Sequence, residues 1–404
     1  MFIATNILYK TRIYYICSMA NFPKKLSKKL TERAAQNALR ELPLSSNLID
    51  FTSNDYLGFS KNLSIYEKAS KLLSDENHKR NGATGSRLIS GNYSLYTQVE
   101  QNIASFHQVD SALVFNSGYD ANVGFFGAVP QRGDVILYDE YIHASIRDGI
   151  AMSNAKAFKF KHNSLEDLGK VIRRIQANLP SESEIYVVTE SVFSMDGDSP
   201  DLQSFAKLCA DNGYHLVVDE AHAIGVFGFD GQGLLFDLGI QNQVFAQIIT
   251  YGKAMGCHGA AILGSDALKE FLINFSRSFI YTTGLPPHSV ATIMAAYQEL
   301  TQEKSSREKL QQLISYIHGE VKNQGLETVF IPSNSAIHCC LIPNADKVKK
   351  VAKNLEKKGY NVKAILSPTV PLGQERLRIC LHSYNTIEEI KNLLSILKTA
   401  MTSL

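Results

Sequence analysis

The sequence predicts an α/β fold in which a mainly parallel sheet is flanked by helices and followed by a smaller α/β domain. In the middle of the chain, short apolar runs alternate with amphipathic stretches, which is the pattern of a parallel sheet wrapped by helices. The length of 404 residues exceeds one ordinary hydrophobic core, so we expect a large domain and a smaller one. Hydrophobic residues make up 45% and charged residues 20% of the chain, as is typical of a folded globular protein.

The expected strands and helices follow from the spacing of the apolar residues. The candidate strands of the large sheet are residues 112–115, 134–138, 185–190, 215–219, 246–250 and 259–263. Residues 164–177 and 202–212 have the apolar spacing of helices. Pro286 and Pro287 interrupt the chain, and one long helix is expected from about residue 288 to 323. Beyond it we expect strands at 336–342 and 377–381 and helices at 345–358 and 387–400. We therefore predict an N-terminal arm (1–60), a large domain (61–290) and a small C-terminal domain (291–404).

Bulk composition excludes several classes of protein. Lys+Arg 41 against Asp+Glu 39 leaves a net charge of +2, so no nucleic-acid partner is expected. No run approaches the ~18 apolar residues of a membrane span. The six cysteines form no CxxC pair, which favours a reducing compartment, and we expect a cytoplasmic protein.

The first 18 residues form a poor signal peptide because Lys10 and Arg12 interrupt their apolar character. We expect Met19 to be the initiator, so that residues 1–18 are absent from the mature protein. The alternative is an organelle-targeting segment.

Polar residues that end the strands are the first candidates for a site, because ligands of open α/β sheets bind at the carboxyl ends of strands. After strand 112–115, Ser117 and Gly118 precede a helix. Glycine permits close approach of a ligand, and the N–H groups of a helix N-terminus suit a phosphate. The alternative is an ordinary strand-to-helix turn.

Strand 215–219 delivers Asp219 and His222 to one place. A buried carboxylate is unfavourable unless it is paired, and a protonated ring nitrogen of a cofactor would be such a partner. The same letters, Asp-Glu-Ala-His, also occur in helicases. That reading requires an upstream GxxxxGK[ST] loop, which the chain lacks.

Lys253 stands between Gly252 and Gly256 after an apolar strand, an unusual setting for a solvated surface lysine. A lysine amine becomes a nucleophile when desolvation or neighbouring cations lower its pKa. The alternative is an exposed loop lysine.

Hydroxyl and acidic groups also cluster at 189–198, but no nearby His or Cys and no calcium-loop spacing accompany them, so no metal site is expected.

Taken together, these motifs resemble the α-oxoamine synthase family of fold-type-I pyridoxal-phosphate enzymes over about residues 30–400. The matching strings are Ser53-Asn-Asp-Tyr-Leu-Gly58, 82–91, 219–222, 250–256, 281–287 and Arg376-Leu-Arg378. The resemblance implies a mainly parallel seven-stranded sheet, a smaller C-terminal domain and pyridoxal 5′-phosphate (PLP) as cofactor.

The resemblance also assigns roles to individual residues. Lys253 is expected to carry PLP as a Schiff base and to move the substrate α-proton. Asp219 keeps the pyridine nitrogen protonated, His143 stacks on the ring, and His222 with Ser194 bonds the phenolic oxygen. The other positions that match cofactor contacts are Ser117, Gly118, Tyr119, Glu190, Thr250, Thr282 and Thr283.

Substrates and partners follow from the same resemblance. Thr282 and Thr283 match positions that reach the phosphate of a neighbouring subunit, which implies a homodimer with the active site at the subunit interface. Arg378 matches the arginine that binds the substrate carboxylate, a task that suits a guanidinium fork. The remaining substrate-contacting matches are Arg40, Asn54 and Thr369.

Members of this family condense an amino acid with an acyl thioester. The string 82–91 resembles members that join L-alanine to a pimeloyl thioester in biotin biosynthesis. Branches that use glycine with acetyl-CoA, or serine with a long acyl chain, remain alternatives, and Cys257-His258 departs from the usual small residues. A non-catalytic member is a further alternative, but such proteins generally lack the Schiff-base lysine.

Overall fold

The computed structural model describes residues 22–35, 39–40, 42, 47–176 and 179–402. The chain forms two compact units, Met1–Asn47 and Leu48–Leu404. The first contains helix α2 (Lys24–Ala35), and the second contains all the elements below. Residues 1–18 lie outside the described residues, and the domain boundaries near residues 60 and 290 stay predictions.

The large sheet of the second unit has seven strands in the order β2-β8-β7-β6-β5-β3-β4. Strands β3 to β7 are parallel where they pair, whereas β8 is antiparallel to both β2 and β7. The mainly parallel seven-stranded sheet is therefore confirmed. Its strands are β2 (Ser111–Phe115), β3 (Val135–Asp139), β4 (Lys156–Phe160), β5 (Ile185–Glu190), β6 (His215–Asp219), β7 (Ala246–Thr250) and β8 (Ala260–Gly264).

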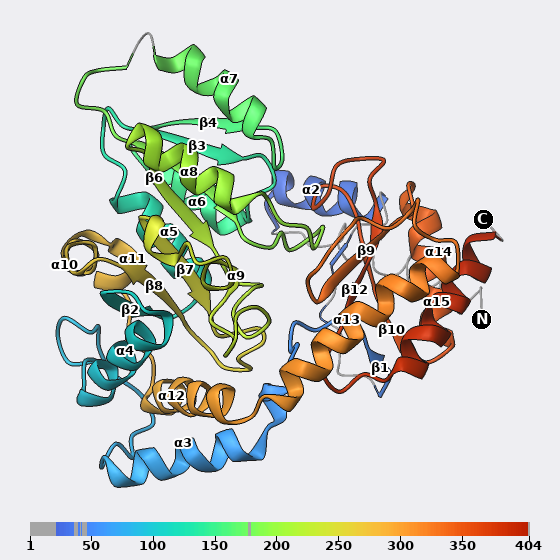
Figure 1. Ribbon diagram of the computed structural model, residues 1–404, viewed down its shortest axis with the longest axis horizontal. Coiled ribbons are helices and arrows are strands. Elements are labelled where there is room, and N and C mark those ends of the chain that lie inside the picture. Colours follow the sequence, from blue (N-terminus) through green and yellow to red (C-terminus); the bar gives the residue numbers. More distant parts are fainter. Residues whose placement is uncertain (1–21, 36–38, 41, 43–46, 177–178, 403–404) are drawn as a thin grey trace. The chain divides into compact units, whose positions relative to one another are not determined.

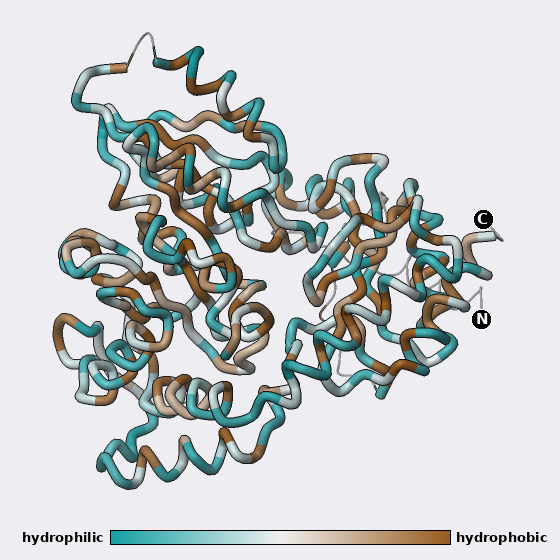
Figure 2. Tube along the Cα trace, in the orientation of Figure 1, coloured by the Kyte–Doolittle hydropathy of each residue, from teal (hydrophilic) through white to brown (hydrophobic). Residues whose placement is uncertain are grey.

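Helices cover both faces of this sheet (Figure 1). Alternate residues of a strand point to opposite faces. Ile136 therefore packs in the core under α5 (Gly118–Ala128), α6 (Ala144–Met152) and α10 (Asp266–Phe275), and Leu137 packs in the core under α7 (Leu165–Gln176) and α8 (Leu202–Asn212). Burial on both faces explains why the central strands read as continuous apolar runs, and Figure 2 shows their hydrophobic colouring.

The expected long helix over 288–323 is wrong, because the chain forms two helices there, α12 (Pro287–Gln302) and α13 (Ser305–Asn323). Between them the carboxylate of Glu303 accepts the backbone N–H groups of Ser305 at 2.8 Å and Ser306 at 3.3 Å. This carboxylate satisfies N–H groups at the start of α13 and so begins a new helix without a glycine or proline.

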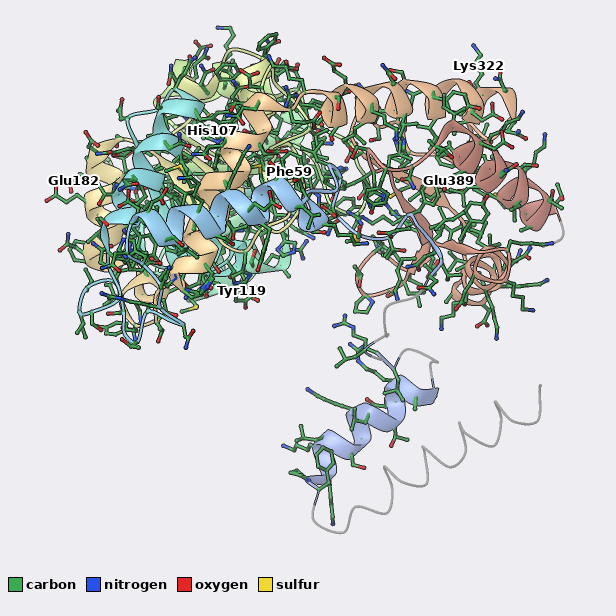
Figure 3. All side chains as sticks on the ribbon, turned by 90° about the horizontal axis from the view of Figure 1, so that it is seen from below. Phe59, His107, Tyr119, Glu182, Lys322 and Glu389 are labelled. Carbon is green, nitrogen blue, oxygen red and sulfur yellow. The ribbon has the colours of Figure 1, made fainter. Side chains whose placement is uncertain are left out.

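A second, three-stranded sheet lies in the C-terminal region, in the antiparallel order β11-β12-β9. Its strands are β9 (Ile337–Leu341), β11 (Lys363–Ile365) and β12 (Arg376–Cys380). Helix α15 (Ile387–Thr402) contacts α13 and α14 (Ala345–Lys357), and Figure 3 labels Lys322 on α13 and Glu389 on α15. Strand β1 (Ile49–Asp50) pairs in parallel with β10 (Tyr360–Asn361), which binds the start of the unit to its C-terminal region.

The other helices are α3 (Leu63–Asp75), α4 (Ser94–His107), α9 (Leu234–Asp237) and α11 (Arg277–Ile280), with short 3-10 turns at Phe59–Lys61 and Gln241–Gln243. Among the helices of the described residues, none combines the length and the apolar character needed to cross a membrane.

Candidate active site

Two carboxylates lie side by side where the neighbouring strands β5 and β6 end. Glu190 and Asp219 are register partners in the parallel ladder, and both are buried. Burial and the charge of Asp219 raise the pKa of Glu190 well above its usual value. Glu190 Oε1 also accepts the backbone N–H of His143 at 2.5 Å. Of the two carboxylates, Glu190 is therefore the one whose protonated form is favoured.

Asp219 is held by neutral donors. Asn122 on α5 donates from Nδ2 to Asp219 Oδ2 at 2.9 Å, and the N–H of Ala221 donates to Oδ1 at 2.9 Å. Within the described part of the chain, no basic side chain forms an ion pair with Asp219. A buried carboxylate with only neutral donors suits a cationic partner supplied by a ligand.

Lys253 occupies the turn that joins the antiparallel strands β7 and β8. The turn is closed by the N–H of Tyr251 bonding the carbonyl of Gly259 at 2.9 Å and by the N–H of Cys257 bonding the carbonyl of Tyr251 at 2.7 Å. The Lys253 amine makes one long contact, 3.4 Å from Nζ to Thr250 Oγ1. Burial lowers the pKa of Lys253, although Asp219 and Glu190 oppose this effect. A desolvated amine loses its proton more readily and becomes nucleophilic.

The N-terminus of α5 faces Thr250 at the end of β7. Ser117 caps this helix by accepting the N–H of Asp120 at 3.1 Å. A Cβ on Gly118 would lie 2.4 Å from Thr250 Cγ2, so only glycine fits this approach. Tyr119 is exposed, and its hydroxyl donates to Asp148 at 2.7 Å (Figure 3). The first backbone N–H groups of α5 are the part of this turn that suits an anion.

His143 is the N-cap of α6, and Ser145 on that helix fixes the orientation of its ring. Ser145 Oγ accepts from Asn122 Nδ2 at 3.0 Å and lies 2.7 Å from His143 Nδ1. The backbone N–H of Ser145 donates to His143 Nδ1 at 3.2 Å, so Nδ1 acts as an acceptor, which the Ser145 hydroxyl proton can also reach. Asn122 thus orients both Asp219 and, through Ser145, the His143 ring. Neither Asn122 nor Ser145 is predicted from the sequence.

A second set of side chains runs from His222 to the small sheet. His222 Nδ1 lies 2.7 Å from the hydroxyl of Tyr56, which lies 3.2 Å from Asn54 Oδ1. Arg378 on β12 donates from Nη2 to the same Asn54 oxygen at 3.0 Å. Burial, together with the charges of Lys253 and Arg378, lowers the pKa of His222 well below its usual value. His222 is therefore neutral in this setting.

Arg376 and Arg378 lie on the same face of β12 but have different partners. Arg376 forms a buried ion pair with Asp196. Arg378, also buried, donates from Nε to the carbonyl of Ser194 at 2.6 Å and from Nη1 to Cys380 Sγ at 2.9 Å. Over the described residues no carboxylate forms an ion pair with Arg378. The Tyr56 hydroxyl is a further hydrogen-bond partner of Arg378, so at least one N–H of the guanidinium remains for a bound anion.

A protonated histidine braces the loop next to the site. His162 Nδ1 lies 2.9 Å from Asp139 Oδ1 at the end of β3, and Nε2 lies 2.9 Å from Asp198 Oδ2. Burial opposes a charge on this ring, but the hydrogen bonds and charges of the two carboxylates outweigh it and raise the pKa of His162 to about 10. The ring therefore carries a positive charge at neutral pH and links β3 to the 194–198 loop.

Of the remaining predicted residues, those of the second unit are not brought into this cluster. Thr282 Oγ1 accepts from Asn116 Nδ2 at 3.1 Å, one residue before Ser117, and Thr283 is exposed beside it. Thr369 is exposed, and Arg40 belongs to the N-terminal unit. Their roles stay predictions. No group of three or more His, Cys, Asp or Glu side chains in the described ranges is arranged to hold a metal ion.

This arrangement fits a planar, phosphorylated aldehyde with a basic ring nitrogen. Lys253 provides an amine for a carbonyl carbon, Asp219 a carboxylate for the ring nitrogen, and the start of α5 its N–H groups for a phosphate. Arg378 would offer its remaining N–H donors to a carboxylate. The site is thus built for a cofactor and an anionic substrate together.

Comparisons with known proteins agree with this chemistry. Residues 46–397 match the family "Aminotransferase class I and II". An 8-amino-7-oxononanoate synthase of Emericella nidulans is 38% identical over 94% of this chain and 97% of its own length. A solved 8-amino-7-oxononanoate synthase of Francisella tularensis has a TM-score of 0.74 and 29% identity over 89% of this chain and 99% of its own. A serine palmitoyltransferase variant of S. paucimobilis, solved with bound PLP-myriocin aldimine, has a TM-score of 0.83 and 26% identity over 94% of this chain and 97% of its own.

Proposed function

We propose that this chain, which belongs to the aminotransferase class I and II family and within it to the PLP-dependent α-oxoamine synthases, joins L-alanine to a pimeloyl thioester. It is an acyltransferase-type enzyme, and PLP is its cofactor. The proposed products are 8-amino-7-oxononanoate, CO2 and a free thiol, as a step of biotin biosynthesis. The thiol carrier is coenzyme A or a carrier protein. The names of the relatives that match nearly the whole chain support this substrate pair.

The single observation that supports an amino acid as substrate is the set of hydrogen-bond partners of Arg378. It is a buried guanidinium with three hydrogen bonds to neutral groups and no carboxylate partner in the described part of the chain. A buried cation of this kind is stabilised when an anion binds to its remaining N–H donors. The carboxylate of an amino acid supplies that anion, and the network through Asn54 and His222 holds it near Lys253.

Each residue of the site has a separate role in this proposal. When bound, PLP supplies an electron sink that stabilises the carbanion formed at the substrate α-carbon. Asp219 keeps a negative charge at the position of the ring nitrogen, and His143, fixed by Ser145, is placed to cover one ring face. His222 and Ser194 are proposed to contact the phenolic oxygen. Gly118 and Thr250 hold the phosphate side.

Lys253 serves twice in this proposal. Its Nζ would hold the aldehyde carbon of the cofactor, and burial, which lowers the pKa of this amine, favours its nucleophilic form. When not bonded to the cofactor, the same Nζ would take up the α-proton of a bound amino acid as a general base. Glu190 lines the site, and its raised pKa favours its neutral form.

We also propose a homodimer with its active site at the subunit interface. Leu88 and Ile89 are 50% and 87% exposed, and Tyr281 is 72% exposed. The N–H of Gly284 bonds the carbonyl of Gly85 at 3.0 Å, which brings their loops together beside Thr282. An exposed apolar patch of this kind suits a protein interface. A cytoplasmic location is proposed on the basis of the five described cysteines, none of which is in a disulfide.

The test is a substrate matrix. Purified holoenzyme is offered L-alanine, glycine or L-serine with acetyl, pimeloyl or palmitoyl thioesters, and release of free thiol is measured. The proposal expects turnover with alanine and pimeloyl thioester at least tenfold above every other pair. Activity confined to serine and palmitoyl thioester would instead identify the second candidate, a serine palmitoyltransferase-like enzyme, which the structural likeness to that enzyme favours. Activity confined to glycine and acetyl thioester would also contradict the proposal.

A further inference from the structure

Tyr56 is a buried tyrosine that bridges two parts of the site. It is fully buried, and its hydroxyl contacts His222 Nδ1 at 2.7 Å and Asn54 Oδ1 at 3.2 Å. The segment that carries Tyr56 is fixed by the residues after β12, since the N–H of Ser383 bonds the Tyr56 carbonyl at 2.8 Å and the Ser383 hydroxyl bonds the Leu57 carbonyl at 2.8 Å. These two hydrogen bonds from Ser383 therefore fix the backbone that carries the Tyr56 side chain.

The protons of this network can be assigned from the partners. Arg378 can only donate, so the atom of Asn54 that faces it is the oxygen, an acceptor. Tyr56 has one hydroxyl proton and, besides the guanidinium of Arg378, two neighbours that could accept it, His222 and Asn54. If that proton pointed to His222, two acceptors, the Tyr56 and Asn54 oxygens, would face each other in a buried site.

Only one assignment makes all three contacts hydrogen bonds. Tyr56 donates to Asn54, and the Tyr56 oxygen then accepts from His222, which must carry its proton on Nδ1. Neutral His222 consequently has no proton on Nε2. The opposite assignment turns the 3.2 Å contact between the Tyr56 and Asn54 oxygens into one between two acceptors, which is unfavourable.

We propose that Tyr56 is a positioning residue that fixes the proton of His222 on Nδ1 and holds the Asn54 oxygen toward Arg378. It acts on the cofactor side through His222 and on the carboxylate side through Asn54. The functional part of this inference rests on the proposed role of Arg378 as the anchor of the amino-acid carboxylate. The proton assignment does not.

The chain contains a matched control. Tyr297 is also buried, and its hydroxyl lies 3.0 Å from Nε2 of the buried His107, which is labelled in Figure 3. Tyr297→Phe removes a buried hydroxyl from a tyrosine–histidine pair, just as Tyr56→Phe does, although the Tyr297 hydroxyl also bonds Tyr251 in the Lys253 turn. Loss of stability is therefore common to both variants, and an effect on the proton position of His222 is expected from Tyr56→Phe alone.

The first measurement is the proton position of His222 in histidine-labelled protein by long-range ¹H–¹⁵N correlation spectra, with His222→Gln used for assignment. Protein without cofactor is used, so the result does not depend on activity. We expect Nδ1 to be protonated in the wild-type protein and this preference to be lost in Tyr56→Phe. A proton on Nε2 in the wild-type protein would overturn the assignment.

The second measurement is the dissociation constant of L-alanine, read from the absorbance change of the holoenzyme. Tyr56→Phe should raise it about tenfold, the equivalent of one hydrogen bond, while the KM of the acyl thioester changes less than about twofold. Tyr297→Phe should raise the dissociation constant of L-alanine less than Tyr56→Phe does. If wild-type enzyme binds no amino acid, the proposed function fails while the proton assignment still stands. If wild-type and Tyr56→Phe bind alanine equally, the positioning role is wrong.

Discussion

The two arginines of β12 allow binding and stability to be separated by the same substitution at two positions. Arg378→Gln removes the guanidinium that has no carboxylate partner in the described residues, and Arg376→Gln removes the one paired with Asp196. Both residues are buried and lie on one face of the strand, two positions apart. We expect Arg378→Gln to affect mainly ligand binding and Arg376→Gln mainly folding.

The magnitudes follow from the hydrogen bonds that each arginine makes. Three of the five N–H groups of Arg378 bond Ser194, Cys380 and Asn54, and the Tyr56 hydroxyl is a further partner, which leaves at least one N–H for the substrate. One charge-assisted bond contributes about 1.5–3 kcal/mol, so Arg378→Gln should raise the dissociation constant of L-alanine at least about tenfold. Arg376→Gln leaves the buried Asp196 unpaired and should lower the free energy of unfolding by about 3–5 kcal/mol.

The assay is a pair of titrations on each variant. Alanine binding is followed by cofactor absorbance, and unfolding is followed in urea with far-UV circular dichroism. Arg378→Gln should lose less stability than Arg376→Gln, because it removes an uncompensated buried charge. The reasoning is refuted if Arg378→Gln binds alanine within about fivefold of wild type, or if Arg376→Gln weakens binding more than Arg378→Gln does.

Other variants test the remaining parts of the site. Lys253→Ala should fold normally but retain no cofactor after borohydride reduction, as checked by mass spectrometry. Gly118→Ala should weaken PLP binding more than about tenfold in equilibrium dialysis, because its Cβ would meet Thr250 Cγ2, and adding Thr250→Ser should restore binding. His162 has a pKa raised to about 10 in the folded state against about 6.5 when unfolded, so its stabilising effect is complete below about pH 6.5 and lost as the pH rises through about 10. His162→Asn should remove about 2 kcal/mol from the urea unfolding free energy at pH 6 and much less near pH 10.

Each of these predictions would be contradicted by a specific result. Covalent cofactor in Lys253→Ala would place the Schiff base on another lysine. No rescue by Thr250→Ser would mean that the close approach at Gly118 does not govern phosphate binding. An unchanged pH dependence in His162→Asn would show that its two carboxylate partners do not hold a charged ring.

Much of the large sheet could be predicted because its central strands are buried on both faces and read as uninterrupted apolar runs. Strand β5 is an example, with all its residues buried. Strand β4 was missed, since this edge strand has the letters Lys-Ala-Phe-Lys-Phe and three of its five residues are exposed. Edge strands carry charge that prevents pairing with other chains, and this charge hides their pattern. The break between α12 and α13 was missed because it depends on a capping carboxylate, that of Glu303, and on no helix-breaking residue.

The site was predictable where a residue ends a strand and unpredictable where it supports another side chain. Lys253 and Asp219 stand at strand ends, and their position follows from the sheet. Asn122, Ser145 and Tyr56 act through contacts between segments far apart in the chain, and local spacing contains no signal of such contacts. Tyr56 did lie within a string that resembles the family, so its position, though not its partner, was visible.

The contact between Asn54 and Arg378 has a consequence for the order in which the site forms. These two residues are separated by 324 positions, whereas Lys253 lies in a turn between strands that are adjacent in sequence. Hairpins close within microseconds, but a contact between distant segments must wait for the intervening chain. On the ribosome, the strands that present the lysine emerge well before the strand that carries Arg378. The half of the site that handles the cofactor can therefore mature first, and a truncated or stalled chain would present a reactive lysine without the arginine that selects its substrate.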